Sequence, residues 1–317
     1  MNYLKDLFTN NWHFNIFYAL LLLAVVTLPL TTYLMLPIAL LMLLNGVVEW
    51  NWKEKWQNVK DRKAIPAFYF FLSICLVPII GFFFSYNKSR ALSAFDCNFW
   101  FFVAPAVFLT YSRNLFTVRR IRVALKWFSV STIVHACILL GVATYKLYKT
   151  GDSSSFYYIK LSFLRHPSYV AMYSTFTFFL LLYFIHHYHR HLSKATLCLL
   201  VFALLILLVL VVFLQSKAGI LVFGILVMIW SCYLIYHAKR KLLWTALFLT
   251  LILGLGQLVF RTDLLPVNRL QETVSQVKNH KQHPYGHGSS EIRLTVWKSS
   301  WEVCRKNLPW GVGSGDV

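Results

Sequence analysis

The sequence predicts an all-α polytopic membrane protein with about nine transmembrane helices and a C-terminal segment outside the membrane. Hydrophobic residues make up 58% of the 317 residues and charged residues only 13%, whereas soluble proteins carry about 25% charged residues. The apolar residues form long runs that approach the length needed to cross a bilayer. Because these runs are continuous rather than alternating with polar residues, they favour helices over the strands of a membrane barrel.

The apolar runs follow one another with short polar connections between them. The clearest contains no charged residue, and as a helix it would extend roughly 28 Å, close to the ~30 Å hydrocarbon thickness. The first two runs are joined by Pro29–Leu30–Thr31–Thr32, which predicts a tight helical hairpin. In chain order, the predicted spans are 14–30, 31–48, 67–85, 91–112, 123–145, 169–185, 196–214 (the clearest), 218–236 and 242–260.

The distribution of lysine and arginine over the short loops predicts the orientation of these spans. With the N-terminus in the cytoplasm, the inner loops hold most of these residues, above all in 53–63 and 113–122, as the positive-inside rule requires. Nine spans then place the C-terminal segment on the outer side. The chain therefore divides into a transmembrane domain, 1–260, and an outer segment, 261–317.

The outer segment is predicted to contain an amphipathic helix followed by a glycine-rich loop. Leu294, Trp297 and Trp301 follow the i, i+3, i+7 spacing of one helix face. Such a helix lies on the membrane surface or caps the bundle of spans. The sequence from Asn307 to Gly315 then breaks the helix, and glycine-rich loops of this kind can approach a phosphate through backbone N–H groups.

The net charge of +20 raises the question of nucleic acid, but the positive residues are scattered over loops between spans. No soluble basic domain is present to bind nucleic acid, so anionic membrane lipids are the expected partner of this charge. Two histidine groups, 186–191 and 280–287, lack the helical pairing with carboxylates that metal sites require. We therefore expect no metal and no nucleic-acid partner.

Lys217 is the first candidate for a functional cation. It lies in Gln215–Ser216–Lys217–Ala218–Gly219, a junction that leaves almost no loop between two strongly apolar runs. The small residues Ala218 and Gly219 allow a ligand or another backbone to approach, and they open a helix whose amino end favours anions. This pattern indicates a phosphate or diphosphate site at the outer membrane surface. The alternative interpretation is an interfacial lysine that extends its amine to water.

Arg165 and His166 form the second candidate, in Arg165–His166–Pro167–Ser168–Tyr169. Proline disfavours helix at the preceding residue and suits the first turn of a following helix. Both side chains are therefore expected just outside the membrane, on the same side as Lys217. Arginine has a planar fork that fits phosphate oxygens, and histidine exchanges protons near neutral pH. The alternative is an ordinary positive loop in front of a helix-starting proline.

Together these elements resemble the O-antigen ligase and O-antigen polymerase superfamily of bacterial envelope enzymes. The resemblance rests on His166–Tyr169, on Gln215–Gly219, and on an outer loop with Arg293, Trp297, Pro309 and Gly311-Val-Gly-Ser-Gly-Asp. It implies transfer of a glycan from a polyprenyl diphosphate, typically undecaprenyl diphosphate, at the periplasmic face of the inner membrane. A ligase uses lipid A–core as acceptor, and a polymerase uses another lipid-linked repeat unit. The resemblance implies no cofactor, because the diphosphate is already an activated leaving group.

The resemblance also assigns roles to residues. Arg165, Lys217 and Arg293 are the expected diphosphate-binding cations, and Arg293 and His166 are the expected catalytic residues. The family usually has arginine where this chain has Lys217, and lysine loses the bidentate geometry. The family's outer loop continues into a His–Asn element and further spans, so we expect the sequence to be C-terminally truncated. Two functions of other classes stay open, a transporter of lipid-linked glycan and a non-catalytic membrane assembly partner.

Overall fold

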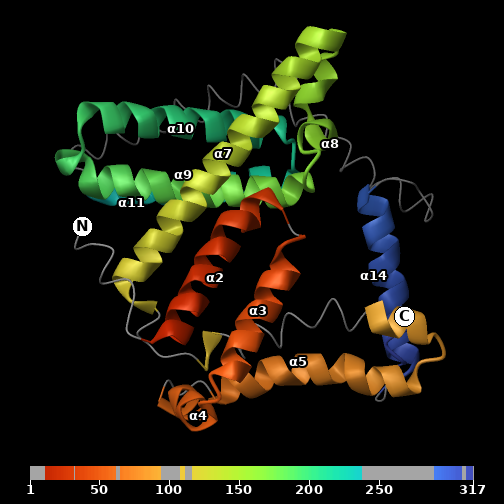
Figure 1. The fold of residues 1–317 in the computed structure, drawn as a ribbon. Helices are drawn as coiled ribbons and strands as arrows, with labels where there is room; N and C mark the ends of the chain where they lie inside the picture. Colours follow the sequence, from red (N-terminus) through yellow and green to blue (C-terminus); the bar gives the residue numbers. More distant parts are fainter. Residues whose placement is uncertain are drawn as a thin grey trace. The chain divides into compact units, whose positions relative to one another are not determined.

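The structure, a computed structural model, describes residues 11–31, 33–61, 65–93, 108–110, 116–237, 289–308 and 312–316. These residues form helices, turns and short connections, and no strand occurs among them (Figure 1). Six of the described helices are long and apolar enough to cross a membrane, or up to seven if one bent pair counts as a single span. The predicted fold class, an all-α polytopic membrane protein, is confirmed.

Six of the predicted spans correspond to helices that are long and apolar enough to cross a membrane. The predicted span 31–48 is a shorter helix, α3 (Met35–Val48). The predicted span 242–260 lies wholly outside the described residues, and 91–112 lies mostly outside them. The division of the chain at residue 260 also falls there and stays a prediction. The remaining spans correspond to α2 (Trp12–Leu30), α5 (Ile65–Phe84), α7 (Val118–Thr150), α9 (Pro167–Tyr188), α10 (Lys194–Phe213) and α11 (Lys217–His237).

The chain forms two compact units. Unit 1 comprises Met1–Ala24, Thr32–Ala124 and Gln276–Val317, and unit 2 comprises Val25–Thr31 and Leu125–Ser275. Unit 1 holds the N-terminal hairpin, α5 and the outer helix α14 (Ser289–Lys306). The predicted amphipathic helix is therefore present, and its Trp297 and Trp301 side chains are exposed.

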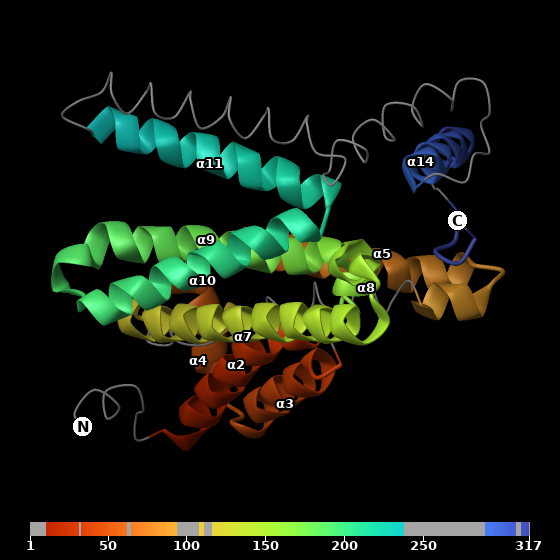
Figure 2. The same ribbon diagram turned by 90° about the horizontal axis from the view of Figure 1, so that it is seen from above.

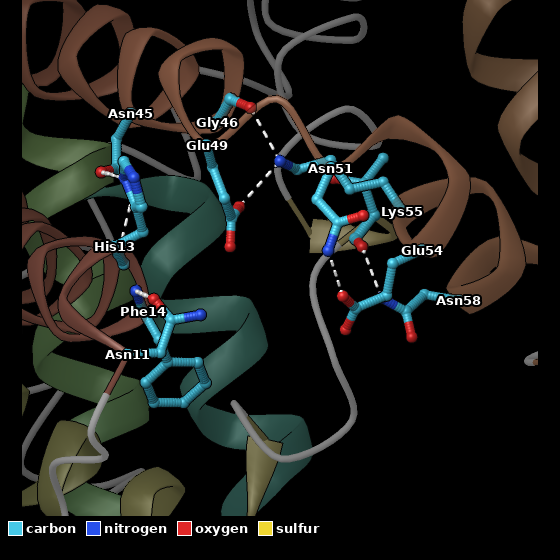
Figure 3. A network of polar contacts seen from close by, with 11 residues as sticks. Asn11, His13, Phe14, Asn45, Gly46, Glu49, Asn51, Glu54, Lys55 and Asn58 are labelled. Atoms are coloured by element: carbon cyan, nitrogen blue, oxygen red, sulfur yellow. Dashed lines mark hydrogen bonds and ion pairs between the residues drawn. The ribbon is translucent and has the colours of Figure 1, made fainter.

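The predicted N-terminal hairpin is formed by α2 and α3. Its apolar core packs Phe17 and Tyr18 of α2 with Ile38 and Met42 of α3. At the open end of the hairpin the two helices exchange polar contacts between His13 and Asn45, whose side chains lie beside each other in Figure 3. The Asn45 amide donates to the His13 carbonyl oxygen at 2.9 Å, and the two side chains lie 3.0 Å apart at His13 Nδ1 and Asn45 Oδ1. These contacts satisfy polar groups that would otherwise be costly in an apolar surrounding.

A short helix that the sequence did not predict, α4 (Trp52–Asp61), follows α3 at an angle of 110°. The bend is held by Lys55, whose amine donates to the Gly46 carbonyl oxygen and to Glu49 Oε2, each at 2.7 Å (Figure 3). Asn51 also bonds to Glu54 at the start of α4. The sequence pattern alone predicts a basic loop for the lysines of α4. It does not indicate the helix, because the contact that fixes the helix joins residues on both sides of the bend.

Unit 2 is built around α9, which packs against both α10 and α11 (Figures 1 and 2). The ring contacts Phe178–Phe223 and His186–Trp230 follow the same order along both helices, so α9 and α11 run parallel. α10 connects them in the opposite direction and contributes Leu207 and Leu210 to the buried core. The amino ends of α9 and α11 consequently lie at the same end of this unit.

The ion pair at the α3–α4 bend gives a test of this part of the fold. Lys55→Ala is expected to destabilise the protein by roughly 3 kcal/mol, because it leaves the Glu49 carboxylate poorly solvated and without its cation. Thermal unfolding of the detergent-solubilised protein, followed by circular dichroism, measures the change. Lys53→Ala is the matched control, since Lys53 is exposed on the same helix. An equal loss in both variants would show that Lys55 does not hold the bend.

Candidate anion site at the amino ends of α9 and α11

Arg165 lies directly before α9 and is buried, with 8% of its surface exposed. Its guanidinium Nη1 donates to the Tyr173 hydroxyl at 2.9 Å, and its carbon Cζ lies 5.4 Å from the centre of the Tyr173 ring. Its other nitrogens, Nε and Nη2, are buried and have no hydrogen-bond partner among the residues that the structure describes. These two N–H groups form one edge of the planar fork, the edge that pairs with two oxygens of a carboxylate or phosphate.

Lys217 is the first residue of α11. Gln215 has a positive φ of 46°, which turns the chain sharply between α10 and α11. The Lys217 amine is buried and, like the free edge of Arg165, has no hydrogen-bond partner. An interfacial lysine that reaches water would expose this amine, so its burial favours the anion-binding interpretation over the alternative.

Two contacts join the amino ends of α9 and α11. The first is between the Ser216 and Ser168 hydroxyls, which lie 3.3 Å apart. At the α11 end, the Ser216 hydroxyl also accepts a bond from the Gly219 N–H at 3.2 Å. Gly219 is buried so close to α9 that an added Cβ would lie 2.5 Å from Cβ of Ala171. The structure therefore brings the residues after Arg165 and those around Lys217 together. Both helices are long, and their N-terminal dipoles add positive potential at this end.

The acidic residues of unit 2 are nearly absent from its described part. Among residues 25–31 and 125–237, Asp152 is the only aspartate or glutamate. Its carboxylate is already engaged by the Ser154 hydroxyl at 2.6 Å and the Lys160 amine at 3.2 Å. The bonds from the Ser154 side chain and backbone, followed by Lys160, lower the pKa of Asp152 to about 2. No carboxylate among these described residues is therefore left to pair with Arg165 or Lys217, which makes their end of the unit a candidate site for an anion.

His166 is exposed and caps α9. Its Nδ1 accepts a hydrogen bond from the Ser168 N–H at 3.3 Å, and Pro167 occupies the first helical turn. Proline at this position and a capping side chain before it explain why the helix begins here. Because Nδ1 is the acceptor, the proton of the neutral ring lies on Nε2. His166 can thus donate a hydrogen bond from Nε2 at the amino end of α9.

Arg293 lies in α14 and is exposed, and it belongs to unit 1. Its membership in the same site as Arg165 and Lys217 stays a prediction. The glycine-rich turn also belongs to unit 1. Its N–H groups at Ser314 and Gly315 bond to Gly81 and Ser85. These donors are used inside the protein, so the expectation that they approach a phosphate does not fit the described turn.

Sequence reasoning missed two residues near Arg165. The first is Tyr173, which orients the guanidinium and packs its ring edge-on against Phe128 of α7. The second is His135. His135 of α7 is 2% exposed, its Nε2 has no partner, and the charge of Arg165 acts on it. A histidine within an apolar span is a functional candidate by default, and this signal could have identified it. Nothing in the spacing could have identified Tyr173, because its bond depends on how the Arg165 side chain, in front of α9, lies against a residue eight positions further along the chain.

Within the described residues, no group of three or more histidine, cysteine, aspartate or glutamate side chains could hold a metal ion. The histidine group 186–191 lies at the far end of α9, where His186 packs against Trp230 and Tyr233. The group 280–287 lies outside the described residues.

Comparison with known proteins finds a family match for the C-terminal part of the chain. A family model described as O-antigen ligase matches residues 202–317. The matched stretch starts inside α10 and includes Lys217, Arg293 and the glycine-rich turn, whereas Arg165 and His166 precede it. No curated protein and no solved structure matches the chain. The match supports the family expected from the sequence.

The close approach of α9 and α11 gives a steric test of the site. Gly219→Ala is expected to destabilise the protein by about 1–3 kcal/mol, because the new methyl group overlaps Ala171. Gly224→Ala, in the same helix, has open space around the added carbon and should be neutral or stabilising by up to about 1 kcal/mol. Thermal unfolding in detergent compares the two. Changes of the same sign and size would contradict the close packing.

Proposed function

We propose, from the match of residues 202–317 to a family model described as O-antigen ligase, that the chain is a glycosyltransferase of the bacterial envelope. It moves a glycan from a polyprenyl diphosphate, such as undecaprenyl diphosphate, to an acceptor such as lipid A–core at the periplasmic face of the inner membrane. The N-terminus is cytoplasmic and the segment 261–317 is periplasmic. The alternative within the same chemistry is an O-antigen polymerase, whose acceptor is another lipid-linked repeat unit.

The observation that carries this proposal is the pair of buried cations at the amino ends of α9 and α11. Arg165 keeps the Nε and Nη2 edge free, and Lys217 keeps its amine free. A diphosphate carries several negative oxygens and fits both kinds of donor, since arginine binds two oxygens at once and lysine acts as a point charge. A membrane-anchored diphosphate reaches such a site from the bilayer, which suits its place at the ends of two spans.

The chemistry follows from charge development at the leaving group. The acceptor hydroxyl oxygen attacks the anomeric carbon of the glycan, the bond from that carbon to the diphosphate oxygen breaks, and the hydroxyl proton passes to solvent water. Negative charge then grows on the diphosphate, where Arg165 and Lys217 stabilise it. Arg293, in unit 1, stays a candidate cation by resemblance to the family, and the mutations below test it by its effect on transfer. His166, with its proton on Nε2, donates a hydrogen bond to the departing diphosphate. This reaction uses the stored energy of the diphosphate and requires no cofactor.

The proposal predicts the effect of removing each cation. Arg165→Ala and Lys217→Ala are each expected to lower the rate of glycan transfer by about 10²–10³-fold, the usual cost of one charge-stabilising donor. Lys217→Arg keeps the charge and adds bidentate geometry, so it should retain transfer. The assay uses the purified full chain, a glycan on undecaprenyl diphosphate, and lipid A–core as acceptor. Lys160→Ala is the control, because Lys160 is exposed and pairs with Asp152.

Further arms of this experiment separate the alternatives. In cells, Lys217→Ala and Arg293→Ala should each abolish surface glycan, and normal glycan with both changes would refute the assigned site. Elongation of lipid-linked repeat units without transfer to lipid A–core would identify a polymerase. A transporter or an assembly partner would give no transfer to either acceptor.

A further inference from the structure

The glycine-rich turn, residues 312–316, docks onto the carboxyl end of α5 within unit 1 (Figure 1). The Ser314 N–H donates to the Gly81 carbonyl oxygen at 3.3 Å, and the Ser314 hydroxyl donates to the Pro78 carbonyl oxygen at 3.2 Å. The Gly315 N–H donates to the Ser85 hydroxyl at 2.9 Å. These contacts join residues more than 200 positions apart in the sequence, so the turn is fixed to α5 at several points.

The two described glycines of the turn are required by this docking. Gly313 and Gly315 are both buried. A Cβ on Gly313 would overlap the Ser85 backbone, and a Cβ on Gly315 would overlap the Asn87 carbonyl oxygen. Since the obstructing atoms belong to the backbone, they cannot rotate away as the end of a flexible side chain could. The glycines therefore serve close packing against the residues that follow α5.

Asp316 provides the charged contact of the docked turn. Its carboxylate accepts hydrogen bonds from the Tyr86 N–H at 3.0 and 3.1 Å and from the Asn87 N–H at 3.0 Å. These N–H groups lie between α5 and the helical residues that begin at Lys88, where neither donates to a helix carbonyl. Bonds from N–H groups to a carboxylate are about twice as strong as those between neutral groups. Asp316 is therefore the strongest single hold on the turn.

The docked turn restricts the position of α14. The helix ends near Lys306, where Asn307 bonds back to Val303 and Cys304. The chain between Leu308 and Val312 can extend at most about 14 Å. The carboxyl end of α14 is thereby kept within a short distance of α5. Arg293 lies on the same rigid helix, roughly 20 Å from that end, so its range of positions is limited by the same contact.

We propose that Asp316 is a positioning residue of glycan transfer, which holds the outer segment and Arg293 in place by binding the N–H groups of Tyr86 and Asn87. This inference rests on the proposed function, because it assigns the contact to that reaction. Asp316 does not touch the substrate in this account. Its effect on the reaction passes through the placement of α14, and a substitute restraint between the turn and α5 should replace it.

The first part of the test measures the contact without reference to activity. In the full-length protein, hydrogen exchange followed by mass spectrometry should show faster exchange for Asp316→Ala at residues 85–91 and 312–316. Glu302→Gln is the matched control, since Glu302 is an exposed acidic residue of α14. Unchanged exchange in Asp316→Ala would overturn the inference at this step, because Asp316 would then not hold the turn.

The second part measures transfer in the same variants. Asp316→Ala should lower kcat by about ten- to a hundredfold, as expected for a displaced catalytic group, with KM for the donor less affected. Asp316→Asn should lose less, because its amide oxygen still accepts one of the bonds. Glu302→Gln should transfer at the wild-type rate. Wild-type transfer by Asp316→Ala, with its turn shown to be released, would overturn the positioning role.

A disulfide provides the rescue. An added Cβ at Gly81 would lie 3.0 Å from the Ser314 Cβ, slightly shorter than the usual Cβ–Cβ distance of about 3.5–4.5 Å in a disulfide. Gly81→Cys with Ser314→Cys, placed in the Asp316→Ala protein, should recover transfer on oxidation and lose it again on reduction. A cross-linked protein that stays inactive, beside an active wild type, would contradict positioning. Absence of transfer in the wild type would instead refute the proposed function and the assignment of Asp316 to it, while exchange would still report the contact.

Discussion

The end of unit 2 where α9 and α11 begin is governed by uncompensated positive charge. Buried cations near a membrane are costly unless an anion or strong hydrogen-bond acceptors surround them. Arg165 is held by Tyr173 through one nitrogen only, and Lys217 has no bond to its amine. The single acidic residue in the described part of this unit, Asp152, is engaged with Ser154 and Lys160. Within the described residues no anion compensates these two cations, which is the basis of the proposed diphosphate site.

The remaining features of unit 2 bring together the helix ends beside which these cations lie. Parallel packing of α9 and α11 puts both amino ends at one side, and the Ser168–Ser216 contact and the small Gly219 bring them close. Parallel neighbours require an intervening antiparallel helix, which α10 supplies. Burying each positive charge without an anion is costly, and in the proposed transferase this cost is recovered when charge grows on the leaving diphosphate.

Much of this could be predicted from the sequence, and the exceptions have physical reasons. The long apolar runs located the spans, and Pro167 and the Gln215–Gly219 junction located Arg165 and Lys217, because helix starts and interrupted apolar runs are local signals. Helix α4 was missed because it depends on a contact across a bend, and Tyr173 because its bond depends on the conformation of the Arg165 side chain in front of α9. The glycine-rich turn lies within the stretch that matches the family model. Its N–H groups nevertheless serve packing against α5 rather than phosphate binding. A glycine pattern reports that backbone must come close to something, and only the structure shows to what.

Binding of the isolated leaving group tests the central claim most directly. Native mass spectrometry of the full-length protein in detergent can compare undecaprenyl diphosphate with undecaprenol, which has the same chain and no phosphate. The account predicts that the diphosphate binds selectively, that added salt weakens it, and that Arg165→Ala and Lys217→Ala each remove the selectivity. Equal binding of the two lipids by the unaltered protein, or selectivity that survives the loss of both cations, would contradict the account.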